Sequence, residues 1–301
     1  MKRDARGPIA LIITALVWGF AFSAQSNAMN HVGPYTFVFL RSLITCAVLF
    51  AALPFLRKIT KHNTENSVSA RQYIRVGFIC GTVLALATVL QQIGLVTTIP
   101  AKSGFITALY IIFVPILGLL FRQRPTFTIW IGALLSLCGL YFLCMKTGFA
   151  LEPGDLITLS CALGFAVHII AVDRLGGSLD SVILSAVQFA AAALWTGILA
   201  FTLETTNWSG ISACWIEILY AAVFSGAIGY TLQIVGQKYT EPTLAALLMC
   251  LESVFSAIGG WLLLGNALTG RELLGCALML SASVVAQIPV GSRQRTNASS
   301  L

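Results

Sequence analysis

Long apolar stretches alternate with short polar breaks along almost the whole chain of 301 residues. Each stretch is about 20 residues long, the length that a helix needs to cross the hydrocarbon core of a bilayer. Helices are the expected state because each backbone donor and acceptor within lipid must be satisfied inside its own segment. The pattern predicts an all-α integral membrane protein with ten transmembrane helices, near 8–28, 34–56, 73–95, 100–121, 127–145, 155–172, 180–203, 212–236, 242–264 and 271–289.

The composition agrees with lipid as the main solvent of the fold. Hydrophobic residues make up 57% of the chain and charged residues 10%, against about 25% charged in an ordinary soluble domain. The formal net charge of +7 does not indicate a nucleic-acid partner, because the basic residues lie at the ends of the expected spans and form no stripe. The eight cysteines have no CxxC spacing and no histidine companions, so we expect no disulfide, no metal site and no cofactor.

The basic residues also predict the orientation, because Lys and Arg are retained on the cytoplasmic side of short loops. One side collects fourteen of the eighteen and the other only three. The first group is Lys2, Arg3, Arg6, Arg57, Lys58, Lys61, Arg71, Arg75, Arg122, Arg124, Arg174, Lys238, Arg293 and Arg295, and the second is Lys102, Lys146 and Arg271. Both termini are therefore expected in the cytoplasm. The N-terminus imitates a signal peptide, but nine similar segments follow it, which predicts a retained first span.

An internal repeat is visible when the chain is shifted against itself. A shift of 142 residues places Leu90-Gln91 on Leu232-Gln233, Pro100 on Pro242 and Phe113 on Phe255. We therefore expect two five-helix repeats, residues 1–148 and 149–301. Because five is odd, the second repeat enters the membrane from the opposite face, and the repeats are inverted. Such repeats place a solute site near the midplane and alternate its access by rocking one half against the other.

Two local features carry structural expectations. Pro115 lies inside the fourth span, where it removes one backbone hydrogen bond and predicts a kink. Its counterpart at the shift of 142 is Ala257, so the two halves need not bend alike. Lys102 opens the fourth span at the external surface, and we expect it to be an interfacial anchor.

The chain resembles the EamA-type members of the drug/metabolite transporter superfamily over essentially its whole length. The first half carries Gln91-Gln92-Ile93-Gly94-Leu95, Lys102-Ser103-Gly104-Phe105-Ile106-Thr107, Tyr110 and Pro115, and the second carries Leu232-Gln233, Pro242, Leu251-Glu252-Ser253-Val254-Phe255, Leu262-Leu263-Leu264-Gly265 and Gly275. The resemblance implies a ten-helix inner-membrane carrier, in many cases an exporter of amino acids or other metabolites. One departure is Asn266, where many relatives have an acidic residue, so no role of a carboxylate is carried over to that position.

Glu252 is the only acidic residue expected near the bilayer centre. It lies about ten residues into the ninth span, or about 15 Å deep at a rise of about 1.5 Å per residue. A charge at that depth costs about 3 kcal/mol on insertion scales, so such residues usually face a cavity, a partner or a proton path. Glu252 is a candidate for proton coupling or for binding a substrate amine. The alternative is a glutamate that only ties helices together.

Arg41 is the only basic residue well inside a span. It could hold a substrate carboxylate, or instead pair with helix-end carbonyls or extend to the interface. Gln91 and Gln92, near the outer end of the third span, and Gln233, near the inner end of the eighth, supply amides at equivalent places on opposite faces. These glutamines are candidate gate residues, and hydrogen bonds between helices explain them almost as well.

Four further candidates are ring-bearing residues inside the spans. His168 is the sole histidine expected within the membrane, where it could relay protons or serve as a structural residue. Trp18, Tyr110 and Tyr230 lie away from the interfaces where aromatic belts collect. They could shape a substrate cavity or contact a cation through their ring faces, and ordinary packing is the alternative.

The sequence has no nucleotide-binding loop, no catalytic residue set and no metal motif of an intramembrane enzyme, so we expect transport and not catalysis. We predict a secondary-active, alternating-access transporter of a small metabolite, an amino acid or similar amphipathic solute, acting in export with proton coupling left open. The alternatives are a drug, nucleoside or sugar carrier of the same fold, or a non-coupled facilitator or channel. Its expected partners are the small-molecule substrate and the lipid bilayer, for a monomer or homodimer in the inner membrane.

Overall fold

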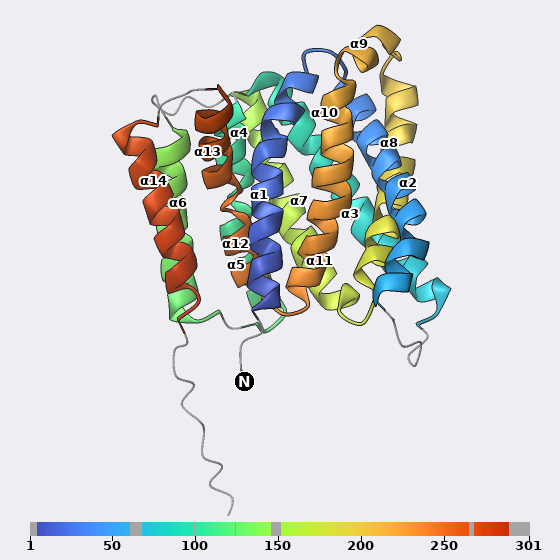
Figure 1. Ribbon diagram of the computed structural model, residues 1–301. Coiled ribbons are helices and arrows are strands. Elements are labelled where there is room, and N and C mark those ends of the chain that lie inside the picture. Colours follow the sequence, from blue (N-terminus) through green and yellow to red (C-terminus); the bar gives the residue numbers. More distant parts are fainter. Residues whose placement is uncertain are drawn as a thin grey trace, which may run out of the picture.

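The computed structural model describes residues 5–60, 68–98, 100–123, 125–145, 152–264 and 268–288. Within those ranges every regular element is helical (Figure 1). The elements before residue 146 are α1 (Arg6–Ala28), α2 (Pro34–Thr60), α3 (Ala70–Thr97), α4 (Pro100–Thr107), α5 (Tyr110–Leu120) and α6 (Phe127–Cys144). Those after residue 151 are α7 (Pro153–Gly176), α8 (Ser181–Leu203), α9 (Trp208–Ala213), α10 (Trp215–Tyr220), the π-helix η1 (Ala221–Tyr230), α11 (Thr231–Gln237), α12 (Pro242–Met249), α13 (Glu252–Leu264) and α14 (Gly270–Val285).

Nine helical segments in the described ranges are long and apolar enough to cross a membrane. They correspond to the first nine expected spans, with α4 and α5, α10 to α11, and α12 and α13 each forming a single crossing. The tenth expected span, 271–289, corresponds to α14, whose 16 residues fall short of that length. The expected boundary at residues 148 and 149 and the position of Asn266 lie outside the described residues.

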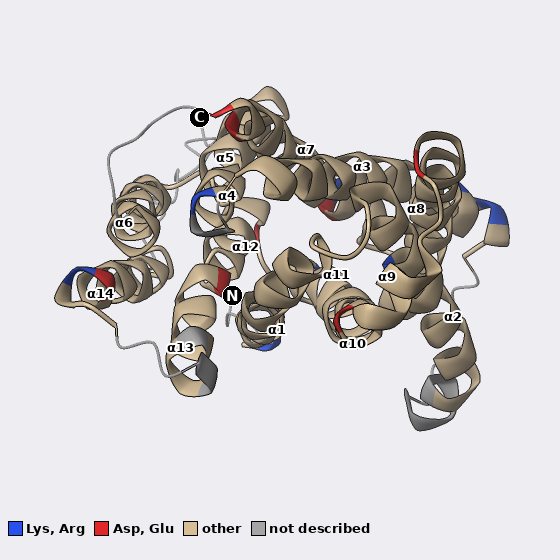
Figure 2. Cartoon of the chain, turned by 90° about the horizontal axis from the view of Figure 1, so that it is seen from above, with Lys and Arg blue, Asp and Glu red and all other residues tan. Residues whose placement is uncertain are grey.

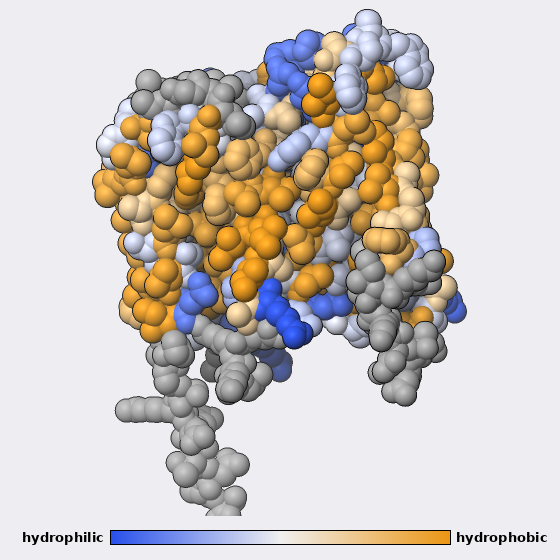
Figure 3. Space-filling model, in the orientation of Figure 1, coloured by the Kyte–Doolittle hydropathy of each residue, from blue (hydrophilic) through white to orange (hydrophobic). Residues whose placement is uncertain are grey.

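The outer surface of the bundle is strongly apolar. Leu120, Phe127 and Phe201 are each more than 70% exposed, and Figure 3 shows such residues as a broad band between more hydrophilic ends. A surface of this kind is stable only where lipid covers it. The exposed side chains therefore face the bilayer core, and the protein is a multi-pass membrane protein.

Several helices begin with a residue that satisfies the free backbone N–H groups of the first turn. The Asp180 carboxylate accepts hydrogen bonds from the backbone of Val182 and Ile183 at the start of α8. Capping boxes start α7, with Glu152 and Asp155, and α14. The polar breaks in the sequence thus end one helix and start the next.

The most extensive helix contacts all join an element before residue 146 to one after residue 151. They are the pairs α6 with α14, α3 with α7, α2 with α8, α3 with α8, and α1 with α13. Seen from above, α6 and α14 lie together at one side of the bundle, and α2 lies at the opposite side (Figure 2). The buried surface therefore lies mainly between the two parts of the chain.

The fourth and ninth expected spans are both interrupted in their middle. At each break the backbone bonds tighten from the i−4 to the i−3 carbonyl, the pattern of a 3₁₀ turn. The bonds are Leu109 N to Ile106 O at 3.1 Å and Ile111 N to Ala108 O at 3.1 Å in one span, and Leu251 N to Leu248 O at 3.2 Å and Ser253 N to Cys250 O at 3.3 Å in the other. The shift of 142 residues that reveals the sequence repeat relates these bonds pair by pair.

These breaks correct the expectation drawn from the proline. Pro115 lies within α5 and not at the break, and the ninth span is interrupted in the same way although Ala257 stands at the equivalent position. Proline is therefore not the common cause of the breaks, which lie at equivalent positions in the two crossings.

Candidate functional site

A cavity lies between the two parts of the chain, where the interrupted spans face α1, α2, α3, α7 and the η1–α11 segment. It contains about 520 Å³ of space not filled by atoms, part of it open to solvent. Seven of the nine candidate residues line it: Trp18, Arg41, Gln91, Tyr110, Tyr230, Gln233 and Glu252. The remaining two stand one layer behind the wall. Residues far apart in the sequence thus converge on one site.

Arg41 is 2% exposed and lies in a network of amides. Its Nη1 donates to Gln25 Oε1 at 2.8 Å, and Gln92 Nε2 donates to the same oxygen at 2.7 Å. Arg41 Nε is buried without a hydrogen-bond partner, and no carboxylate in the described part of the chain forms an ion pair with the guanidinium. Arg41 therefore neither extends to the interface nor meets a counter-ion, and an anionic group in the cavity would satisfy it.

Glu252 is the first residue of α13, directly after the break. Its side chain lines the cavity, and within the described residues it forms no ion pair. The break thus places a carboxyl group deep in the bundle with no cation of the described residues paired to it.

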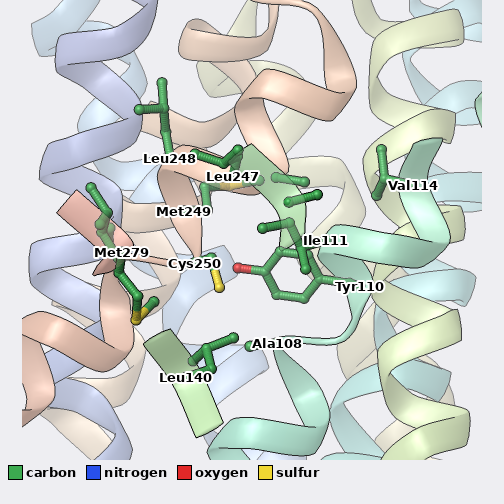
Figure 4. Packing of buried hydrophobic residues seen from close by; sticks show 14 of the residues in the cluster. Ala108, Tyr110, Ile111, Val114, Leu140, Leu247, Leu248, Met249, Cys250 and Met279 are labelled. Carbon is green, nitrogen blue, oxygen red and sulfur yellow. The ribbon is translucent and has the colours of Figure 1, made fainter. Parts of the chain in front are cut away.

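Tyr110 occupies the equivalent place as the first residue of α5. Its hydroxyl is buried and has no hydrogen-bond partner among the described residues. Figure 4 shows its ring turned toward Cys250, the residue that follows α12. Thr107 Oγ1 and Gln233 Oε1 also line the cavity without a partner. Buried polar atoms of this kind need a partner, and a polar solute would supply one.

Aromatic rings form one wall of the cavity. The Trp18 and Tyr230 ring centroids are 4.7 Å apart, and Phe189 packs edge-on behind Tyr230 at 5.3 Å. The Tyr230 hydroxyl lies within electrostatic range of both Arg41 and Glu252. Rings in this position bury the apolar part of a solute and attract a cation with their faces.

The π-helix η1 brings Tyr230 to this wall. Widened π turns leave backbone carbonyls available to other donors and often occur at functional sites. Three side chains from α1 and α2 use them: Thr14 Oγ1 donates to Gly229 O at 3.2 Å, Trp18 Nε1 to Ser225 O at 3.1 Å, and Thr45 Oγ1 to Ala222 O at 2.8 Å. The two parts of the chain are thus joined at the cavity wall.

The other two candidates support the wall and do not line it. Gln92 bonds to Gln25, as above. His168 is fully buried, with Nε2 3.1 Å from Gln188 Oε1, and its ring meets Tyr230 edge-on at 6.0 Å. His168 therefore contacts the cavity only through Tyr230.

Lys102 does more than anchor the surface. It is 7% exposed and its Nζ lies 2.6 Å from Asp155 Oδ2, which is 3% exposed, and 3.6 Å from Glu152 Oε2. Thr98 Oγ1 also donates to Asp155, at 3.3 Å. The expectation of an interfacial anchor is corrected to a buried ion pair that joins α4 to the start of α7.

Gln25 and Phe22 are cavity residues that the sequence reasoning missed. Gln25 lies close to the end of α1, where a polar residue suggests an interface. The available signal was spacing, because Trp18, Phe22 and Gln25 follow each other at intervals of four and three and therefore share one helix face.

Comparisons with known proteins agree with the fold. The model of the EamA-like transporter family matches twice, at residues 5–145 and 152–287. A protein of Archaeoglobus fulgidus named as an uncharacterized transporter is 28% identical over 288 residues, covering 94% of this chain and 86% of its own. One solved crystal structure has a TM-score of 0.76 at 19% identity, covering 95% of this chain and 97% of its own, which shows a shared fold.

Two further relatives are named as the threonine/homoserine exporter RhtA. The protein of Salmonella typhimurium is 27% identical over 169 residues, 54% of this chain and 55% of its own length. That of Escherichia coli is 26% identical over 175 residues, 56% of this chain and 57% of its own. This chain thus matches little more than half the length of each exporter. The two family matches together cover nearly all of the chain, which therefore belongs to the EamA-like transporter family.

Proposed function

We propose that this protein is a secondary-active, alternating-access carrier that exports small amphipathic metabolites, with amino acids as its solute class. One observation carries the proposal: the central cavity is lined by a cation, Arg41, and a carboxyl group, Glu252, and neither forms an ion pair with any residue that the structure describes. A zwitterion complements both charges. The names of the RhtA relatives support an amino acid as solute.

The proposed architecture is ten spans in two inverted five-helix repeats, residues 1–148 and 149–301. The protein lies in the inner membrane, with both termini in the cytoplasm. The double family match, the matching breaks and the contacts between the two parts of the chain support it. Discontinuous helices at the interface of inverted repeats commonly form the solute site of secondary transporters.

In the bound state, the solute carboxylate lies against Arg41 and displaces none of its bonds to Gln25, because Arg41 Nε is unused. The solute ammonium lies at Glu252, with the Trp18 and Tyr230 rings beside it. The solute side chain packs against Phe22 and Phe165. Arg recognises carboxylates in a planar, directional manner, so the solute has one orientation.

Glu252 is also the proposed coupling residue. A carboxylate in a cavity is costly when it is charged and unpaired. Glu252 therefore holds either a proton or the ammonium group of the solute, and one replaces the other. Binding of the amine releases the proton to the side that is open, and return of the empty carrier requires protonation. This cycle exports the solute against an inward flow of protons.

Flux measurements in proteoliposomes test the proposal. The panel contains labelled amino acids, the amines that lack their carboxylate and the acids that lack their amino group, each with and without a proton gradient. We expect saturable, proton-dependent flux with trans-stimulation, strongest for the zwitterions. Flux that stays linear with concentration would identify a channel, and equal flux of all three classes would refute recognition by two charges.

A further inference from the structure

A second concave region lies at the end of the bundle where α3 begins and α7 ends. It contains about 1390 Å³ of unfilled space, part of it open to solvent, and is separate from the central cavity because the two share no lining residue. Three arginines line it, Arg71, Arg75 and Arg174, and no carboxylate among the described residues does. We call this region the arginine groove.

The positive charge of the groove is largely uncompensated. Arg71 and Arg75 are exposed on successive turns of one face of α3 and form no ion pair in the described part of the chain. The first turn of α3 contains no acidic residue, so the charge of Arg71 also opposes the helix dipole. The positive charge at the start of α3 therefore destabilises this helix. A bound anion would remove the destabilisation.

The third arginine is held in place by the protein. Arg174 Nη2 donates to Phe121 O at 3.0 Å, its guanidinium lies 5.3 Å from the Phe121 ring centroid, and Nε is 3.9 Å from Asp173 Oδ2. Asp173 reduces the charge beside Arg174, so Arg71 and Arg75 provide the main positive pole.

The other side of the groove is apolar and continues into the lipid-facing surface. Val76, Ile79 and Leu175 line it. Ile79 is 39% exposed, and Phe78 beside it is 42% exposed, with its ring 6.0 Å from that of Trp195 on α8. The positive charges of Arg71 and Arg75 are thus followed along α3 by an exposed apolar strip, Phe78 and Ile79, which we call the apolar track.

We propose that the arginine groove binds one anionic phospholipid. Its phosphate lies between Arg71 and Arg75, because guanidinium groups bind phosphate oxygens through paired hydrogen bonds. One acyl chain lies along Ile79 and Phe78. A soluble phosphate would satisfy the arginines but leave the apolar track uncovered, and basic pockets between spans are known to take anionic headgroups. Since α3 and α7 belong to different halves, the lipid binds where the halves meet.

Native mass spectrometry of the full-length protein in detergent tests this site. Phosphatidylglycerol and phosphatidylcholine with the same acyl chains are added in equal amounts, and bound lipid is counted per protein. We expect preferential retention of phosphatidylglycerol. The double variant Arg71→Gln/Arg75→Gln should bind it about 30-fold more weakly, since each basic residue near an anionic lipid contributes a factor of about five. The matched control Arg6→Gln/Arg122→Gln removes two arginines outside the groove and should change retention little.

Two additions keep the outcome decisive. The variant Arg71→Lys/Arg75→Lys keeps the charges that orient the chain in the membrane, and it should fold normally while losing part of the preference, because lysine lacks the paired donors. Inorganic phosphate at millimolar concentration should not displace the lipid. Equal retention of both lipids, unchanged binding by the glutamine variant, or displacement by phosphate alone would each overturn the proposal.

Discussion

Tyr110 and Glu252 stand directly after the two helix breaks, at positions related by the shift of 142 residues, yet one is a phenol and the other a carboxylate. The basic group of the cavity shows the reverse bias, since Arg41 lies on α2 and α8 contains no basic residue. The helix breaks therefore occur in both halves, whereas the charged side chains of the cavity do not occur at equivalent positions. Each half contributes one pole of the cavity.

The third and eighth crossings differ in a similar way. Gln91 and Gln233 are equivalent and both line the cavity, but α3 is α-helical over 28 residues whereas its counterpart contains the π-helix η1. Equivalent backbones in the two halves suit the proposed motion, in which one half rocks against the other. The different side chains at equivalent positions suit a solute that binds in one orientation. The predictions below alter one side of this comparison at a time.

Removing the acidic pole should have the largest effect. In Glu252→Gln, transport of amino acids should fall about 100-fold in kcat/KM, because a buried charge then lacks its partner. Dependence on the proton gradient should disappear. The control is Glu241→Gln, an exposed glutamate just before α12 in the same crossing. Full, gradient-dependent transport by Glu252→Gln would eliminate the coupling role.

Removing the basic pole should have a somewhat smaller and selective effect. Arg41→Gln should lower kcat/KM for amino acids about 30-fold, since the solute carboxylate loses a charged partner. The amines that lack a carboxylate should be transported as before. Arg41→Lys should recover part of the loss. An equal loss for amines and amino acids would indicate that Arg41 only maintains the network with Gln25.

Loosening the tie between the halves should affect stability more than recognition. Asp155→Asn leaves Lys102 facing Glu152, whose side chain is 45% exposed, so the free energy of unfolding should fall by about 1.5 kcal/mol, less than for a fully buried pair. Thermal unfolding in detergent measures the change. Solute affinity should stay as in the unaltered protein, and a large change in affinity would instead connect this ion pair to the cavity.

Crowding the π-helix should have the smallest effect. A Cβ at Gly229 would overlap Trp18 Nε1 and approach Trp18 Cδ1 to 3.0 Å, so Gly229→Ala should displace the Trp18 ring and cost about 1 kcal/mol of stability. Solute affinity should weaken with it. In the control Gly104→Ala the nearest atom, on Phe22, is 3.7 Å from the added Cβ, and the change should be neutral. If both variants behave alike, the Trp18 position is unimportant.

The sequence predicted nine membrane-spanning segments that the described residues contain, because bilayer thickness fixes their length. It also singled out Arg41 and Glu252, which both line the cavity, because charges at that depth are rare. It did not predict the breaks at Leu109 and Leu251. Neither involves glycine or proline, and their position depends on packing between segments distant in the chain. The ion pair of Lys102 was missed for the same reason, since its partner lies on another helix.

The interrupted crossings also separate the cavity from changes in the membrane itself. A continuous helix such as α3 answers a thinner or thicker bilayer by tilting as one rod. The crossings formed by α4 with α5 and by α12 with α13 each contain a break. We expect one helix of such a crossing to tilt at this break, the joint, without moving the other helix equally. Tyr110 and Glu252 stand at these joints, so we expect the part of the cavity wall that these two side chains form to shift less with bilayer thickness than the part formed by the continuous helix α3.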